Sequence, residues 1–193
     1  MISISDEKSK EEPENLALIQ ALVNTRYGYG QRLHTELTRP DQLRIWLLQH
    51  NLLPDGISVA EGDFRRMIQL RETLRGLLLA NNEGASQVSQ LETFNHLASN
   101  APLTVHFEQD GSLSLQPDVD GVDGVIARLV GIVFTNVQDG TWIRLKACRN
   151  ERCQKAFYDS SKNRSGVWCS MASCGNRLKA NAYRHRHMVQ KDE

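Results

Sequence analysis

The sequence has no long hydrophobic run. No stretch of about 18 apolar residues occurs, the length at which a membrane-spanning helix becomes a candidate. Residues 1–15 are acidic and polar, so they lack the features of a signal or transit peptide. These absences predict a cytoplasmic protein with no membrane partner. Because structural disulfides are rare in that compartment, we expect the cysteines of this chain to have another role.

The sequence also lacks the common motifs of catalysis. It contains no Ser-His-Asp set, no Cys-His pair, no paired-carboxylate motif and no glycine-rich phosphate loop. The pairs Gly28/Gly30 and Gly121/Gly124 do not follow a strand into a helix, as a phosphate loop requires. The six histidines are scattered, and none forms a motif with a nearby acid. We therefore expect that the protein is not an enzyme.

Aromatic residues are few, at 6%, but the apolar share of 40% is ordinary for a chain of 193 residues that builds a core. The formal net charge of zero hides a split along the chain. Residues 1–140 contain 11 Lys/Arg and 19 Asp/Glu (net −8), whereas residues 141–193 contain 12 and 4 (net +8). All four cysteines lie in the basic segment. Such asymmetry indicates a C-terminal end that binds a polyanion.

The pattern of apolar residues predicts an α+β fold. Helical spacing predicts five helices, near 14–24, 40–50, 58–80, 86–99 and 122–137. The last of these is apolar almost all round, so we expect it to be buried. Alternation on both sides of Asp110-Gly111 predicts a β-hairpin, and alternation over 141–147 predicts a strand. The glycines at 28 and 30 are interpreted as a break after the first helix.

The composition divides the chain into three parts. Residues 1–13 are predicted to be a disordered arm. Residues 14–140 are predicted to form a mostly helical domain with a β-hairpin. Residues 141–193 form a small basic module that contains the cysteines.

The four cysteines form two closely spaced pairs. Cys148/Cys153 and Cys169/Cys174 both have the spacing C-x4-C, and 15 residues separate the pairs. Two thiol pairs joined by a hairpin are typical of a structural Zn²⁺ site, with four sulfurs and no open position for catalysis. The alternatives are disulfides, four unrelated buried thiols or an iron–sulfur cluster. The expected compartment disfavours the first, the clustering disfavours the second, and the spacings match none of the usual iron–sulfur patterns.

The residues around the cysteines predict a nucleic-acid contact. A short strand, a polar turn and a helix from Cys174 to about Met188 make a treble-clef arrangement. When this helix is projected at 100° per residue, a polar face lies between two rows of cations. Cationic rows are suited to phosphates, and the polar centre is suited to base edges. The candidate DNA-binding residues are Asn176, Arg177, Lys179, Tyr183, Arg184, Arg186 and His187 on the helix, with Lys162 and Arg164 on the preceding turn. The alternative is a solvated basic helix, or one that docks on an acidic protein surface.

These residues resemble a known family. The segment from Cys169 to Arg177 carries the Cys-Gly-Asn-Arg signature of the CGNR zinc-finger family, and the resemblance covers residues 144–187. The preceding part is similar to the ABATE domain, in the segments Leu22-Val23-Asn24-Thr25 and Leu70-Arg71-Glu72. The resemblance implies a two-part bacterial protein regarded as a stress-induced transcription regulator. It also implies a zinc-bound treble clef that binds DNA. The zinc ligands that carry over are Cys148, Cys153, Cys169 and Cys174.

One residue of the helical domain suggests a ligand site. Arg71 falls within the apolar arc of its predicted helix, and a buried guanidinium needs a partner. That partner is either a carboxylate such as Asp41 or Glu36, or a small anionic effector in a pocket. Asn24 and Thr25, at a helix end, are further pocket candidates, with helix capping as their alternative role. A small-molecule-binding protein is therefore a further possible class beside the DNA-binding regulator and a zinc-stabilised protein-interaction adaptor.

The size of the predicted zinc module bears on the oligomeric state. A single module of this size buries only about 600–1,000 Å² on DNA. Specific binding therefore needs a second module or a partner protein, and we expect a homodimer.

Overall fold

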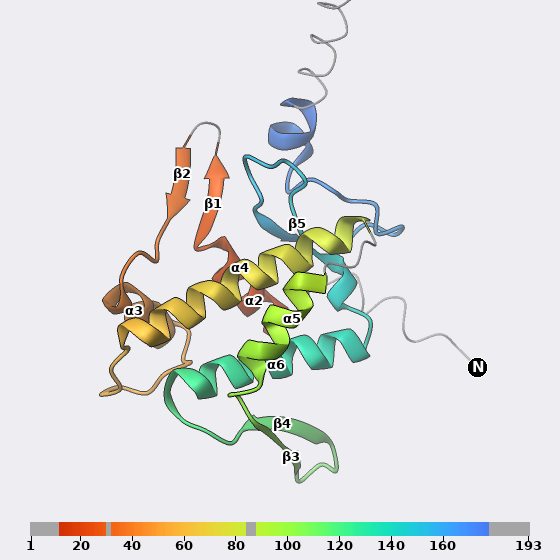
Figure 1. The fold of residues 1–193 in the computed structure, drawn as a ribbon. Coiled ribbons are helices and arrows are strands. Elements are labelled where there is room, and N and C mark those ends of the chain that lie inside the picture. The colour runs from red at the N-terminus through yellow and green to blue at the C-terminus, as the bar shows by residue number, and fades with distance from the viewer. Residues whose placement is uncertain (1–11, 30–31, 84–87, 178–193) are drawn as a thin grey trace, which may run out of the picture.

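The computed structural model describes residues 12–29, 32–83 and 88–177 (Figure 1). Its elements, in chain order, are α2 (Glu14–Asn24), β1 (Arg26–Tyr29), β2 (Arg32–Thr35), α3 (Pro40–Gln49), α4 (Glu61–Glu83), α5 (Val88–Ala98), β3 (Leu103–Phe107), β4 (Leu113–Pro117), α6 (Gly121–Gln138), a 3-10 turn (Trp142–Arg144), β5 (Leu145–Ala147), β6 (Ala156–Tyr158) and a π-type turn (Met171–Gly175). We call residues 14–138 the helical part and residues 141–177 the C-terminal module. The α+β class is confirmed.

The core lies among α2, α3, α4 and α6, with the long helix α4 crossing the molecule (Figure 1). On α4, Met67, Leu70, Leu74 and Leu78 are completely buried, which is the i, i+3, i+7 spacing of one helix face. This helix begins at Glu61, where the carboxylate of Asp63 accepts the Ala60 N–H and so caps the first turn. All five predicted helices are present, and the ends differ by a few residues.

The helix α6 is buried over its first half but not all round. Residues from Val122 to Leu129 belong to the core, apart from partly exposed Asp123 and exposed Arg128. Phe134 and Val137 are about half exposed, at 53% and 50%. The prediction that α6 is buried throughout is therefore wrong at its C-terminal end.

The strands within the described segments form three separate antiparallel pairs. The predicted hairpin is confirmed as β3–β4, with Val105 opposite Leu115. The pair β1–β2 was not predicted, because its strands have only four residues and two glycines obscure any alternation. The strand predicted over 141–147 is present only from Leu145, since the Arg144 N–H bonds to the Thr141 carbonyl and forms a 3-10 turn.

The C-terminal module packs directly on the helical part. Leu145, Ala147 and Ala156 of β5 and β6 belong to the same buried cluster as the helix residues. Asn24 at the end of α2 binds the outer edge of β6, donating to the Ala156 carbonyl at 3.0 Å and accepting its N–H at 2.8 Å. The Asn24 side chain thus pairs with backbone N–H and C=O groups of a strand edge that would otherwise be unpaired.

The other strand of this ribbon is held in a similar way. The Asn81 amide donates to the Trp142 and Leu145 carbonyls, and the Asn82 amide donates to the Ala147 carbonyl. Both asparagines lie near the end of α4. Both edges of β5–β6 are therefore bonded to helices of the other part.

In the part of the chain that the structure describes, no helix combines the length and the hydrophobicity that a bilayer crossing requires.

Candidate metal centre

Four sulfur atoms meet at one point of the C-terminal module. The sulfurs of Cys148, Cys153, Cys169 and Cys174 all lie within 4.8 Å of one another. Those of Cys153 and Cys169 are 3.6 Å apart, and those of Cys169 and Cys174 are 3.8 Å apart. A disulfide would require about 2.05 Å. A tetrahedron of sulfurs at about 2.3 Å from Zn²⁺ has edges of about 3.8 Å, so the donor set fits this ion.

The first pair of cysteines lies on a tight turn organised by Asn150. Cys148 follows β5, and its N–H donates to the Lys155 carbonyl at 2.8 Å. The Asn150 carbonyl accepts the N–H groups of Cys153 and Gln154, and its side chain accepts that of Arg152. Gln154, directly after Cys153, has a positive φ of 52° and lies where the chain turns back into β6.

The second pair lies on a turn held by Ser170. The Ser170 carbonyl accepts the N–H groups of Cys174 and Gly175, and its hydroxyl accepts the Ser173 N–H. The helical turn thus begins at Met171 and not at Cys174 as predicted. At Gly175, an added Cβ would lie 2.8 Å from the Met171 sulfur and 3.2 Å from the Trp168 ring. The glycine of the Cys-Gly-Asn-Arg signature therefore lets the Met171 side chain and the Trp168 ring pack closely against this turn.

The sulfurs cannot all be ionised without a cation. The hydrogen bond with Cys153 lowers the pKa of Cys148 to about 2. The same contact raises the pKa of Cys153 to about 12, and the contact with Cys148 raises the pKa of Cys169 as well. A divalent ion would remove this conflict, because it binds thiolates and releases their protons.

A buried ion pair holds the loop between the two cysteine pairs. Lys146 Nζ lies 2.8 Å from Asp159 Oδ2, and both side chains are 3% exposed. The ammonium also donates to the Arg164 and Gly166 carbonyls. Burial acts to raise the pKa of Asp159, but hydrogen bonds from Lys146 and Ser161 outweigh it and keep this pKa below its ordinary value. The alternating pattern around Lys146 gave no sign that the lysine would be buried.

The structure describes four of the nine candidate DNA-binding residues. Lys162 and Arg164, on the loop held by Lys146, are exposed, as are Asn176 and Arg177 after the second cysteine pair. The other five, Lys179, Tyr183, Arg184, Arg186 and His187, lie outside the described residues, as does most of the predicted helix from Cys174 to Met188.

The candidate effector residues have internal partners. Arg71 is 3% exposed, and its Nε donates to Glu72 Oε1 at 2.8 Å. Another guanidinium nitrogen donates to the Thr25 hydroxyl, which in turn donates to the Leu22 carbonyl and closes α2. Asn24 is used at the edge of β6. These contacts favour the structural alternative for all three residues.

The carboxylate partner of Arg71 differs from the prediction. It is the adjacent Glu72, and not Asp41 or Glu36. The exposed Asp41 and Glu36 bind their own neighbours, Arg39 and His34. The sequence analysis named acids far along the chain, whereas the carboxylate of the next residue is close enough to bind Arg71.

Arg75 connects the two parts and was missed by the sequence analysis. Its guanidinium donates to the carbonyls of Val23 and Arg26, each at 2.7 Å, and to that of Gln154 at 2.8 Å. These carbonyls lie at the C-terminal end of α2 and in the first cysteine turn, and a cation is favourable at such a helix end. The only signal in the sequence was that Arg75 lies four residues after Arg71, about one helical turn further along the same predicted helix.

Gly28 makes a second connection to the metal centre. Its N–H donates to the carbonyl of Cys153 at 2.8 Å. The backbones lie so close that a Cβ at this position would fall 1.6 Å from the Arg152 carbonyl oxygen. The glycine interpreted as a break is thus the point at which β1 touches the first cysteine turn.

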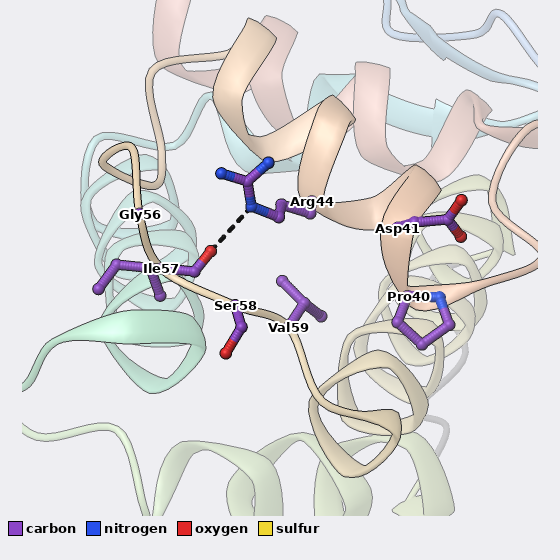
Figure 2. A pocket seen from close by; sticks show the side chains of 7 residues that line it. All are labelled: Pro40, Asp41, Arg44, Gly56, Ile57, Ser58 and Val59. Carbon is purple, nitrogen blue, oxygen red and sulfur yellow. Dashed lines mark hydrogen bonds between the residues drawn. The ribbon is translucent and has the colours of Figure 1, made fainter.

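A cavity of about 460 Å³ lies elsewhere, at the start of α3 (Figure 2). Arg44 Nε donates to the Ile57 carbonyl across it at 2.9 Å and so fastens the loop that precedes α4. Its lining residues are Pro40, Asp41, Arg44, Gly56, Ile57, Ser58 and Val59. Only three of them, Asp41, Arg44 and Ser58, have polar side chains. Because Asp41 is paired with Arg39, we assign this cavity no ligand.

Comparison with protein-family models agrees with this geometry. The CGNR zinc finger model matches residues 144–187, which include all four cysteines. The ABATE model, described as "Putative stress-induced transcription regulator", matches residues 16–130. No curated protein matches the chain in sequence. The four clustered sulfurs and the zinc-finger match together establish a structural zinc site formed by Cys148, Cys153, Cys169 and Cys174. With its ABATE match covering more than half of its length and a CGNR zinc finger following it, the chain belongs to the ABATE family.

Proposed function

We propose that this protein is a DNA-binding transcription regulator of the bacterial cytoplasm, in which the zinc module contacts DNA. The observation that carries the proposal is a set of exposed cations on a scaffold held by zinc, within a segment of net charge +8. The family descriptions, a stress-induced regulator and a zinc finger, support the same role. The zinc has four protein sulfurs and no open position, so we propose no catalytic role for it.

The loop that carries Lys162 and Arg164 supports this proposal because it is held in place. The buried Lys146 ammonium donates to the backbone carbonyls of Arg164 and Gly166 in this loop. The side chains of Lys162 and Arg164 are exposed to solvent. A fixed loop loses little conformational entropy when its cations bind phosphates. Asn176 and Arg177, which follow directly from the zinc-bound turn, are proposed as further DNA contacts. The sequence candidates Lys179, Tyr183, Arg184, Arg186 and His187, which lie outside the described residues, are proposed with them.

A salt series tests the proposal. The affinity of the zinc-loaded chain is measured for its own upstream DNA and for a scrambled duplex. The variant Lys162→Ala/Arg164→Ala is compared with Arg39→Ala/Arg65→Ala, which removes two exposed arginines from the helical part. If both loop cations contact phosphates, the slope of log K against log salt falls by about 2 in the first variant only. Equal affinity and equal slope in wild type and both variants would contradict the proposal.

We also propose that the chain associates with a second copy of itself through the β3–β4 hairpin. Phe107 at the tip of the β3–β4 hairpin is 81% exposed, and Val105 and Leu113 are each more than 60% exposed. Their pairing places all three on one face of the hairpin, which extends beyond α6 (Figure 1). Exposed apolar side chains gathered in this way mark interaction surfaces. We expect a homodimer through this face, and Phe107→Ser is expected to lower the sedimentation coefficient to that of a monomer.

A further inference from the structure

A large cavity lies at the junction of the two parts. Its volume is about 1020 Å³, at the upper end of the range for small-molecule sites. One wall comes from α2, β1 and the residues before α2, and the opposite wall comes from the first cysteine turn, β6 and the second cysteine turn. Three of the zinc ligands, Cys153, Cys169 and Cys174, are also among its lining residues. The cavity is separate from Arg71, the residue that the sequence suggested for an effector.

One wall of the cavity has acceptor atoms that lack a donor. Glu12 Oε1 and Gln20 Oε1 are both buried, and neither has a hydrogen-bond partner among the described residues. Burial raises the pKa of Glu12, with no offsetting contact. Unpaired buried acceptors are costly, and in native proteins they usually have a partner. A ligand with hydrogen-bond donors would supply one.

The other wall supplies positive charge and aromatic surface. Arg152 and Arg177 are exposed cations of this wall. Lys155 Nζ lies 4.9 Å from the centre of the Tyr27 ring, so it bridges the two walls. Phe157 adds a second aromatic side chain. Arginines select carboxylate and phosphate groups, and aromatic rings favour a planar partner.

We propose that this cavity binds a small organic anion that has a planar ring and hydrogen-bond donors. Its acidic group would bind Arg152 and Arg177, its ring would lie near Phe157, and its donors would reach Glu12 and Gln20. Because Gly28 of one wall donates to the carbonyl of the zinc ligand Cys153, the ligand would lie at the contact between the ABATE domain and the zinc finger. The proposal goes beyond DNA binding and does not depend on it.

Two probes distinguish the chemical source of the anion. Adenosine monophosphate has a phosphate, a planar base and donor groups, whereas 4-aminobenzoate has a carboxylate, a ring and an amine. Isothermal titration of the zinc-loaded chain with each probe measures the affinity and the stoichiometry. Inorganic phosphate serves as the control for non-specific attraction of an anion. We expect one of the two ring-containing probes to bind at one site per chain, more than tenfold more tightly than phosphate.

Two variants locate the site. Arg152→Ala is expected to weaken binding of that probe at least tenfold, since it removes a cation from an exposed position without disturbing the core. Gln20→Leu is expected to weaken it at least fivefold, and the unliganded protein should unfold at the same or a higher temperature because an unpaired acceptor is removed. Arg65→Ala, which removes an exposed arginine of α4 outside the cavity, should change nothing.

The proposal would be overturned by any of three results. The first is that neither probe binds at millimolar concentration. The second is that phosphate binds as tightly as the ring-containing probes. The third is that both site variants retain wild-type affinity. A loss of DNA binding in the loop variant Lys162→Ala/Arg164→Ala bears only on the proposed function, because neither residue lines this cavity.

Discussion

The helical part is stabilised by a large cluster of buried leucine, isoleucine and valine side chains, whereas the C-terminal module has hardly any apolar interior of its own. Its separate cluster consists of Cys148, Cys153 and Cys174, with Trp168 and Cys169 packed against them. The apolar residues of its strands are buried against the helices instead. Comparison of the two parts indicates that the module depends on two supports, the zinc ion and the helical part.

The loss of zinc is expected to have the largest effect. Cys174→Ala, or removal of zinc by a chelator, leaves the C-terminal module without its interior, because zinc binding is folding free energy in such modules. We expect the module to unfold and the whole chain to lose several kcal/mol of stability, roughly 3–5. Thermal unfolding with parallel zinc analysis measures this loss. An unchanged melting temperature in a zinc-free sample would contradict the inference that the C-terminal module depends on zinc.

A variant of the buried ion pair tests the module without touching zinc. In Asp159→Asn, Lys146 keeps its charge but loses its carboxylate, and we expect a loss of about 3 kcal/mol at pH 7. The pKa of Asp159 in the folded protein is below its ordinary value of 3.8, so its stabilisation is complete above that value and is lost as the pH falls through the folded pKa.

Urea unfolding of wild type and Asp159→Asn at a series of pH values provides the measurement. The difference in unfolding free energy should be constant from pH 7 down to the ordinary carboxyl value, and it should shrink below it. Zinc content is measured at each pH so that metal loss is separated from carboxyl protonation. A difference that grows on acidification would refute the assignment.

The contact between the two parts is broken by a single methyl group. In Gly28→Ala the new Cβ would meet the Arg152 carbonyl at 1.6 Å, so β1 must move away from the first cysteine turn. We expect a loss of about 2 kcal/mol and a weaker hold on zinc, seen as faster zinc release to a chelator. Gly62→Ala, at a helical position with open space around it, is the matched control and should leave zinc release unchanged.

The smallest effect is expected for an ion pair of the helical part. Arg66 of α4 contacts Asp63 and Asp123, but all three side chains are a quarter or more exposed. Arg66→Ala should therefore cost about 0.5–1 kcal/mol in urea unfolding. A loss as large as that of Asp159→Asn would show that polar contacts matter equally in both parts.

The sequence predicted the elements with strong periodicity and missed those set by distant contacts. The spacing of Met67, Leu70 and Leu74 predicted α4, and the C-x4-C pairs predicted the zinc ligands, because both patterns are local. The strands β1 and β2 are too short to show a pattern, and their position is fixed by a contact with Cys153 far along the chain.

The polar connections between the two parts could not have been predicted. Asn24 was expected to cap a helix or line a pocket, but it binds the backbone of Ala156, 132 residues later. Arg75 binds carbonyls from two separate segments. A single polar residue in a helix does not reveal such a partner, because backbone carbonyls are present everywhere in the sequence.

Hydrogen exchange of the full-length chain, with and without zinc, tests most directly whether the two parts depend on each other. Loss of zinc should remove protection in the C-terminal module. It should also lower protection at the end of α2 and in β1, where Asn24, Gly28 and Arg75 make their contacts. Protection deep in α4 around Leu70 should remain. If the zinc-free chain loses protection only in the C-terminal module, with α2 and β1 unchanged, the two parts are independent and this account is wrong.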